Sequence, residues 1–193
     1  YTRDVFHRLC QWDLVATDLV PLVVQYQDDS DVVYNALKVL TFLTMPVDPE
    51  SDDLHVQCRE LARIKDCFLA NDAVAVIVGL LSRPLSRYPR LSEKDILVVQ
   101  LVLTFVRNLL CVDSAARDLG IDNPLAEEDE RKGNLISRPF KDNVLELVLL
   151  VAQHCNEKAF KNDASLVLHI VYQVFEGFSP LQLFQKRQPK ASG

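Results

Sequence analysis

Two histidine–cysteine pairs have the spacing that brings two metal ligands together on one helix. His7 precedes Cys10 by three residues, and His55 precedes Cys58 by the same interval. Imidazole nitrogens and thiolates bind structural zinc, so the two pairs together could form a four-ligand site. Such sites usually rest on Cys-x-x-Cys knuckles, which this sequence lacks. We therefore expect the thiols to pack in the core, and we expect neither a metal nor another cofactor.

Nucleophilic catalysis would need a serine or cysteine beside a base. His154 directly precedes Cys155, but adjacent helix residues point about 100° apart and cannot pair. The sequence has no Gly-x-Ser-x-Gly turn and no glycine-rich phosphate loop. His169 lies among apolar neighbours, as a core or groove histidine would. A helical enzyme would need a cleft with convergent ionisable groups, and we locate none in the sequence. We therefore predict no catalytic residue and no enzyme activity.

One short basic segment is interleaved with Tyr88: Arg83, Arg87, Arg90 and Lys94. Arginine and aromatic side chains together could contact phosphate, or an acidic segment of a partner. The net charge of −6 makes broad attraction of the chain to nucleic acid or to an anionic membrane unexpected. These four cations are our candidate contact for DNA or an acidic partner, and a solvated loop is the alternative. Whether Arg63 and Lys65 join them is left open.

The composition is that of an ordinary soluble globular protein, with 49% hydrophobic and 25% charged residues among 193. The 5 cysteines are scattered and odd in number, which predicts reduced thiols in an intracellular protein. The first residue is Tyr1 and not methionine, so we expect a fragment of a longer chain. The most apolar stretch, 96–112, is interrupted by Gln100, Arg107 and Asn108, which favours a buried helix over a membrane span.

Length and start signals predict helices. Residues 93–110 contain no glycine or proline; as a strand they would extend roughly 60 Å, but as a helix only about 27 Å. Ser92 to Asp95, ahead of Ile96, fits a capping box. Asp18 and Asp163 are further start signals, each directly before an apolar run. We expect helices near 2–12, 18–27, 30–44, 51–69, 72–82, 92–111, 140–153 and 163–176, with a short one from Pro180.

Two long connections interrupt these predicted helices. Residues 83–91 carry two prolines and three arginines, and residues 112–139 include an acidic run at 127–130 that we interpret as solvated. We therefore predict one helical-repeat domain over 1–184, followed by a disordered tail or boundary at 185–193.

Three nearly interchangeable runs, 37–43, 103–109 and 168–174, each follow a second apolar segment that opens on Asp18, Asp72 or Asp142. A pattern repeated at intervals of about 65 residues indicates stacked helical units. Such stacks present surface to partners and seldom build a catalytic pocket. The second helix of each unit is apolar on most faces, which suits a helix between neighbours, whereas a terminal helix would leave one face uncovered. We expect Asn108 to hydrogen-bond to nearby backbone.

Four segments resemble, in order and at similar spacing, motifs of the Timeless family of replication-fork protection proteins. Residues 103–110 (LTFVRNLL) resemble its LLLVRNIL helix, in which the Val106-Arg107-Asn108 match is the best element. Residues 18–22 (DLVPL) resemble its SDLLPIL segment. Residues 36–46 resemble its hhhhLhNLTxP segment, where h is apolar, and residues 165–181 resemble LHVLEIVxxMFRxQxPxxL. The matches cover the chain from about Val5 to Leu183.

Two departures from the family pattern concern polar positions. Phe42 stands at the family's asparagine, and residues 175–178 (FEGF) replace its FRxQ.

The resemblance implies an all-α fold, a right-handed α-solenoid of armadillo- or HEAT-like repeats. It also implies a nuclear scaffold that protects replication forks during DNA replication. Such a protein would bind a small Tipin-type partner, travel with the replicative helicase, contact checkpoint mediators in the DNA damage response and help hold duplex DNA within the assembly. We expect DNA binding by this fragment alone to be weak.

Two alternatives stay open. The resemblance also admits a circadian Timeless-like regulator acting through Period. An armadillo-type adaptor for extended peptides would display regularly spaced exposed Asn and Trp, but Trp12 is the single tryptophan and the amides do not recur regularly.

Overall fold

The computed structural model describes residues 3–112, 114, 116, 144–157 and 160–176 of the chain. Every element within these ranges is helical, and none is a strand, so the predicted all-α class is confirmed. Eight-residue or longer α-helices are α1 (Asp4–Gln11), α3 (Ser30–Leu43), α4 (Leu54–Leu69), α7 (Glu93–Leu110), α10 (Val144–Gln153) and α11 (Ala164–Phe175). Shorter ones are α2 (Val20–Gln25), α5 (Ala73–Gly79) and α6 (Ser82–Arg87), with a π-helical turn at Val15–Leu19 and a 3₁₀ turn at Lys161–Asp163.

The start of α7 confirms the predicted capping box. The Ser92 hydroxyl accepts a hydrogen bond from the backbone N–H of Asp95 at 3.2 Å, and the Asp95 carboxylate accepts one from the backbone N–H of Ser92 at 2.9 Å. Two backbone donors that the first turn leaves unpaired are thereby satisfied. The predicted start and end of α11 are also confirmed, because that helix follows Asp163 directly and ends at Phe175.

Two local predictions are wrong. Residues 83–91 were expected to be a loop, but α6 occupies the first part, since buried Pro84 lies within its first turns, where no backbone N–H is needed. Asp18 does not cap a helix; it lies inside the π-helical turn that runs directly into α2.

Several expectations fall on other parts of the chain. The connection 112–139 lies outside the described residues except for positions 112, 114 and 116, which are helical. The start of the predicted helix 140–153, the helix from Pro180 and the tail at 185–193 also lie outside them.

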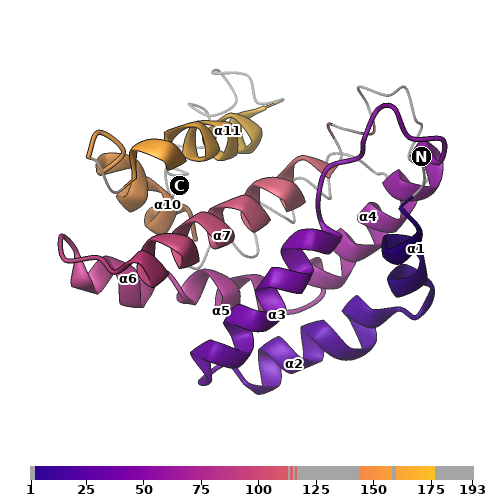
Figure 1. Ribbon diagram of the computed structural model, residues 1–193, viewed down its shortest axis with the longest axis horizontal. Helices are drawn as coiled ribbons and strands as arrows, with labels where there is room; N and C mark the ends of the chain where they lie inside the picture. Colours follow the sequence, from indigo (N-terminus) through magenta and orange to yellow (C-terminus); the bar gives the residue numbers. More distant parts are fainter. Residues whose placement is uncertain (1–2, 113, 115, 117–143, 158–159, 177–193) are drawn as a thin grey trace, which may run out of the picture.

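The helices pack in two rows. In one row α7 lies between α3 and α11 and packs against both (Figure 1). In the other row α5 contacts α2 on one side and α10 on the other. Contacts of α2 and α5 with α3, and of α10 with α11, join the rows. The three similar runs of the sequence therefore fall on α3, α7 and α11, the members of one row.

The most deeply buried helix is α7. Four of its side chains have no solvent-exposed surface: Val99, Val102, Leu103 and Phe105. The Phe105 ring packs edge to face against Phe68 of α4, with 5.2 Å between the ring centroids. Burial on several faces explains why the polar stripe of this helix is thin. By contrast, α11 leaves Leu168, Tyr172 and Phe175 exposed along one face.

A polar network that the sequence did not indicate joins α1 to the start of α4. Gln57, which is fully buried, donates to Ser51 at 2.8 Å and to Asp53 at 2.5 Å. The Asp53 carboxylate also accepts from Ser51 and pairs with His7 of α1. Burial raises the pKa of Asp53, but the hydrogen bonds from Ser51, His7 and Gln57 outweigh it and hold the pKa well below its usual range.

Within the described residues, two buried polar side chains, Asn108 and Asp163, lack hydrogen-bond partners, as does the buried Nε atom of Arg107. Asn108 was expected to bond to nearby backbone, but neither its amide nitrogen nor its oxygen has a partner, so that prediction is wrong. Asp163 is 1% exposed, and neither of its carboxylate oxygens has a hydrogen-bond partner. Burial raises the pKa of Asp163; the Gln100 side chain on α7 lies near enough to lower it in part, although no hydrogen bond to the carboxylate is formed.

The burial of Phe105 leads to a stability prediction. Phe105→Ala should reduce the free energy of unfolding by about 3–5 kcal/mol, because it leaves a cavity against Phe68. Chemical denaturation followed by circular dichroism measures this loss. Leu168→Ala, at a position 71% exposed, is the control and should change stability by less than about 0.5 kcal/mol. Equal losses in the two variants would contradict the placement of α7 in the core.

Asp163 leads to a pH prediction. The pKa of Asp163 is higher in the folded than in the unfolded state, so the folded protein binds the proton more tightly. As pH rises through the pKa of the folded state, Asp163 becomes a buried carboxylate, and the free energy of unfolding falls. Asp163→Asn should therefore be more stable than the parent at pH 7, by about 1 kcal/mol. The gain should shrink as pH falls toward the ordinary aspartate pKa of about 3.9. Thermal melts between pH 4 and 7 test this, and a variant less stable at pH 7 would refute it.

Candidate partner-binding cavity

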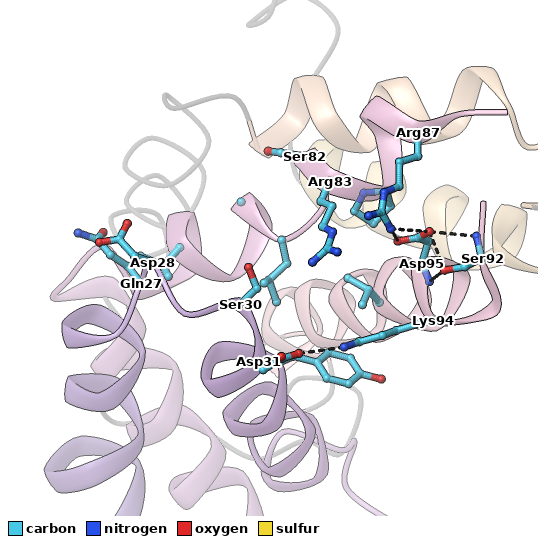
Figure 2. Close-up of a pocket in the computed structure, with 16 residues that line it drawn as sticks. Gln27, Asp28, Ser30, Asp31, Ser82, Arg83, Arg87, Ser92, Lys94 and Asp95 are labelled. Carbon is cyan, nitrogen blue, oxygen red and sulfur yellow. Dashed lines mark hydrogen bonds and ion pairs between the residues drawn. The ribbon is translucent and has the colours of Figure 1, made fainter. Parts of the chain in front are cut away.

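The first turns of α3 and α7 border a cavity of about 440 Å³ together with α6 and the end of α5 (Figure 2). This volume is within the usual range for sites that hold a small molecule or a few side chains. Its walls combine a polar and an apolar part. The polar lining residues are Gln27, Asp28, Ser30, Asp31, Ser82, Arg83, Arg87, Ser92, Lys94 and Asp95, and the others are Tyr34, Val76, Gly79, Leu80, Pro84 and Val98.

Arg87 is committed to a structural ion pair. Its guanidinium Nη1 lies 3.3 and 3.4 Å from the two oxygens of Asp95. Asp95 is buried and also accepts from the Ser92 hydroxyl at 2.7 Å. Hydrogen bonds from the Ser92 side chain and backbone, helped by Arg87, lower the pKa of Asp95 below its usual range. This group therefore fastens α6 to the start of α7.

Lys94 is committed to a second pair, which joins α7 to α3. Its ammonium lies 2.9 Å from Asp31, and the hydrogen bond from Lys94 lowers the pKa of that carboxyl. Both side chains are exposed, so the pair adds little to stability. The Tyr34 ring beside them is also approached by Lys38, whose ammonium lies 4.4 Å from the ring centroid.

Arg83 and Asp28 are the two charged side chains of the described lining that form no ion pair. Neither side chain makes a hydrogen bond or an ion pair with a described residue, although Arg83 helps from a longer distance to lower the pKa of Asp31. Figure 2 shows the Arg83 guanidinium directed from α6 into the cavity. Asp28 lies on the connection between α2 and α3. After the pairs Arg87–Asp95 and Lys94–Asp31 are formed, one positive and one negative group are left for a ligand.

The candidate basic segment is thus only partly assembled. Arg83, Arg87 and Lys94 line the cavity, but Arg90 does not. Tyr88, expected to accompany the cations, packs instead against His154 and Phe160 of the following unit, with ring centroids 4.2 and 6.2 Å apart. The sequence could not indicate Asp28, Asp31 or Tyr34, because these residues come from a distant part of the chain.

The other cations lie elsewhere. Arg63 pairs with Asp13 at 3.2 Å and with Glu60 at 3.0 Å, and Lys65 is buried in α4, so neither lines the cavity. Arg107 and Asn108, the best element of the motif match, lie in the last turn of α7, whereas the cavity lies at its first.

Metal-binding geometry is not assembled by the histidine–cysteine pairs. His7 is engaged with Asp53, and His55 is exposed. Within the described ranges no group of three or more His, Cys, Asp or Glu side chains could hold an ion.

The cysteines lack the features of nucleophiles. All five are free. Burial, with a contribution from Glu60, raises the pKa of Cys10 to about 11. The Cys111 Sγ lies 3.6 Å from Nε2 of His169. Burial raises the pKa of this thiol as well, which disfavours the reactive thiolate.

The chain belongs to the Timeless family, because the family model described as Timeless protein matches residues 1–193. The resemblance seen in its motifs is thereby confirmed. None of the described helices is long and apolar enough to cross a membrane.

Curated relatives give a more distant match. The chain is 27% identical over 191 residues to Topoisomerase 1-associated factor 1 of Cryptococcus neoformans var. neoformans serotype D, strain JEC21. The protein of the same name from strain B-3501A matches with the same identity and coverage. Each match covers 89% of this chain and 18% of the relative, so the chain spans less than a fifth of their length. No solved structure matches significantly.

The Asp95 cluster gives a prediction for the wall of the cavity. Asp95→Asn should lower the free energy of unfolding at pH 7 by about 1–2 kcal/mol, because charge-assisted bonds to Ser92 and Arg87 are lost. The lowered pKa makes this stabilisation present above about pH 3.9 and lost as pH falls through the folded value. The difference between variant and parent should therefore narrow on acidification.

Asp72→Asn is the matched control for this prediction. Asp72 occupies the N-cap position of α5 but its side chain makes no capping bond. Denaturation of both variants at pH 7 and at low pH is the measurement. If Asp72→Asn lowered the free energy of unfolding as much as Asp95→Asn, the capping box and the ion pair of Asp95 would not be the source of the stabilisation.

Proposed function

We propose that this Timeless-family chain is part of a non-enzymatic, nuclear helical-repeat scaffold in a replication-fork protection complex. It would support fork stability, DNA replication and checkpoint signalling through protein contacts. The observation that carries the proposal is the match of the family model to the whole chain. The mechanism would be geometric: a rigid stack of helices fixes the distances between partners bound along it.

The packing of the helices supports an armadillo- or HEAT-like α-solenoid. Such a stack consists of two rows of helices in which each unit contacts mainly its neighbours. Here α3, α7 and α11 follow one another in one row, and α2, α5 and α10 in the other. We propose that these pairs are successive repeats of a right-handed solenoid and that the repeat domain covers residues 1–184.

The chemistry of the described residues favours binding over catalysis. The cavity is lined by arginine, lysine and aspartate, and the pKa values of Asp31 and Asp95 are lowered, so these carboxyls are poor proton donors near neutral pH. It contains no histidine or cysteine. The same charges are suited to recognising a charged partner.

The proposed partners follow from the family. They are a small Tipin-type protein, the replicative helicase and checkpoint mediators. The printed name of the curated relatives associates them with topoisomerase 1, which we add as a partner class. Duplex DNA would be held within the assembly, with only a weak contribution from this part of the chain, whose net charge is −6.

The cavity favours one alternative, an adaptor that binds peptide segments. Its mixed lining of charged and apolar side chains suits a short stretch of polypeptide better than a phosphate backbone. This alternative shares the contact mode of the scaffold but requires no replication partners.

Capture of partners tests the proposal. A tagged chain incubated with nuclear extract should retain replication-fork proteins, identified by mass spectrometry, and Phe105→Ala should lose them because the helical stack is destabilised. Recovery of cytoplasmic peptide-bearing proteins alone would favour the adaptor. In a mobility-shift assay the chain should bind duplex DNA weakly at physiological salt; tight, salt-resistant binding would contradict a scaffold that works through protein contacts.

A further inference from the structure

We propose that the cavity binds a peptide segment of a partner protein that presents a carboxylate to Arg83 and a basic group to Asp28, with an apolar side chain between them. This inference rests on the proposed function as a contact scaffold and specifies what one contact recognises. The partner is a polypeptide of mixed charge, and not nucleic acid.

The balance of charge in the cavity leaves one cation and one carboxylate unpaired among the described residues. The lining holds three cations and three carboxylates, and two of each are already joined: Arg87 with Asp95, and Lys94 with Asp31. The side chains of Arg83 and Asp28 make no hydrogen bond or ion pair within the described residues, and both line the cavity (Figure 2). Complementary recognition therefore requires one group of each sign on the ligand.

The apolar part of the wall suits an aliphatic side chain of the ligand. The apolar lining residues include Val76 of α5, Leu80 directly after that helix, and Val98 of α7. Val76 and Leu80 are only partly buried in the described structure. An aliphatic side chain placed against them would remove apolar surface from water on both sides. A segment with an apolar residue between its charges satisfies both parts of the lining.

The mixed charge of the lining favours a peptide over DNA. A duplex brings a row of negative charges, and sites that hold it neutralise several phosphates with lysine and arginine. Here Asp28 and Asp31 line the same cavity as the cations, and of the described lining cations only Arg83 forms no ion pair. The first turns of α3 and α7 are already capped, by the Asp29 carboxylate and by Ser92 with Asp95, so they do little to offset the repulsion of a polyanion.

Gly79 offers a steric test that involves no charge. It lines the cavity at the end of α5, and a Cβ at this position would meet no atom within 4 Å. Gly79→Leu should therefore extend into the open space without disturbing the helix and should block the site. Gly79→Ala is its control, because a methyl group fills little of about 440 Å³.

The experiment uses a panel of capped peptides with one glutamate and one lysine, separated by one to four residues that include a leucine. Binding to the ¹⁵N-labelled chain is followed by amide chemical shifts. We expect shifts for residues that line the cavity. Arg83→Glu should weaken binding of the best peptide by about tenfold or more, as expected for loss of a charge-assisted hydrogen bond. Arg90→Glu carries the same charge change outside the cavity and should alter binding less than twofold.

Asp28 and the peptide charges complete the test. Asp28→Lys should weaken binding, and a peptide with glutamine in place of glutamate should bind parent and Arg83→Glu alike, because the two changes remove one interaction. Gly79→Leu should abolish the shifts while Gly79→Ala retains them. Unchanged circular dichroism confirms that the variants fold.

Three outcomes would overturn the inference: no peptide of the panel binds, Arg83→Glu and Arg90→Glu weaken binding equally, or a short duplex DNA shifts the same amides more strongly than any peptide. None of these would remove the scaffold, whose own test is the capture of fork proteins. Conversely, binding of the peptides without capture of fork proteins would keep this site and reject the proposed function.

Discussion

The burial of α7 between two neighbouring helices is the constraint on which the rest of the structure depends. This 18-residue helix packs against α3 and α11 in its own row, and its Phe105 reaches Phe68 of α4. A helix covered on several sides cannot shift without opening several interfaces at once, because protein interiors are close-packed. Its two ends are therefore fixed positions to which other elements attach, and in this way a repeated apolar pattern becomes a rigid support.

The cavity is a consequence of how the first turn of α7 is held. The capping box fixes the direction in which the helix starts, Arg87 draws α6 onto Asp95, and Lys94 reaches across to Asp31 at the start of α3. Within the described residues, these contacts pair four of the six charged side chains that line the cavity and leave Arg83 and Asp28 unpaired. The same interactions that order the first turn of α7 thus determine which charged side chains of the cavity stay unpaired. The paired side chains stabilise the helices, whereas the unpaired Arg83 and Asp28 are the ones that we propose recognise a peptide.

Sequence reasoning succeeded where local signals are strong and failed where tertiary contacts decide. The start of α7 follows from Ser92 and Asp95, which need only their own backbone. The short helix α6 was missed because its prolines and arginines resemble a loop, whereas buried Pro84 and the ion pair to Asp95 hold it in place. Buried Asp163 and Asn108 without hydrogen bonds could not be foreseen, since satisfaction of a polar group depends on its neighbours in space. The acidic side of the cavity was missed because it comes from α3 and the chain before it.

Hydrogen exchange of the backbone amides tests the central role of α7 most directly. If the helix is the support on which its neighbours depend, its central amides, around Val102 and Phe105, should exchange only through global unfolding and be the slowest in the chain, while those of α6 and of the exposed face of α11 exchange through smaller openings. Exchange of the α7 amides as fast as those of α6 would mean that the helix opens independently, which would contradict the account.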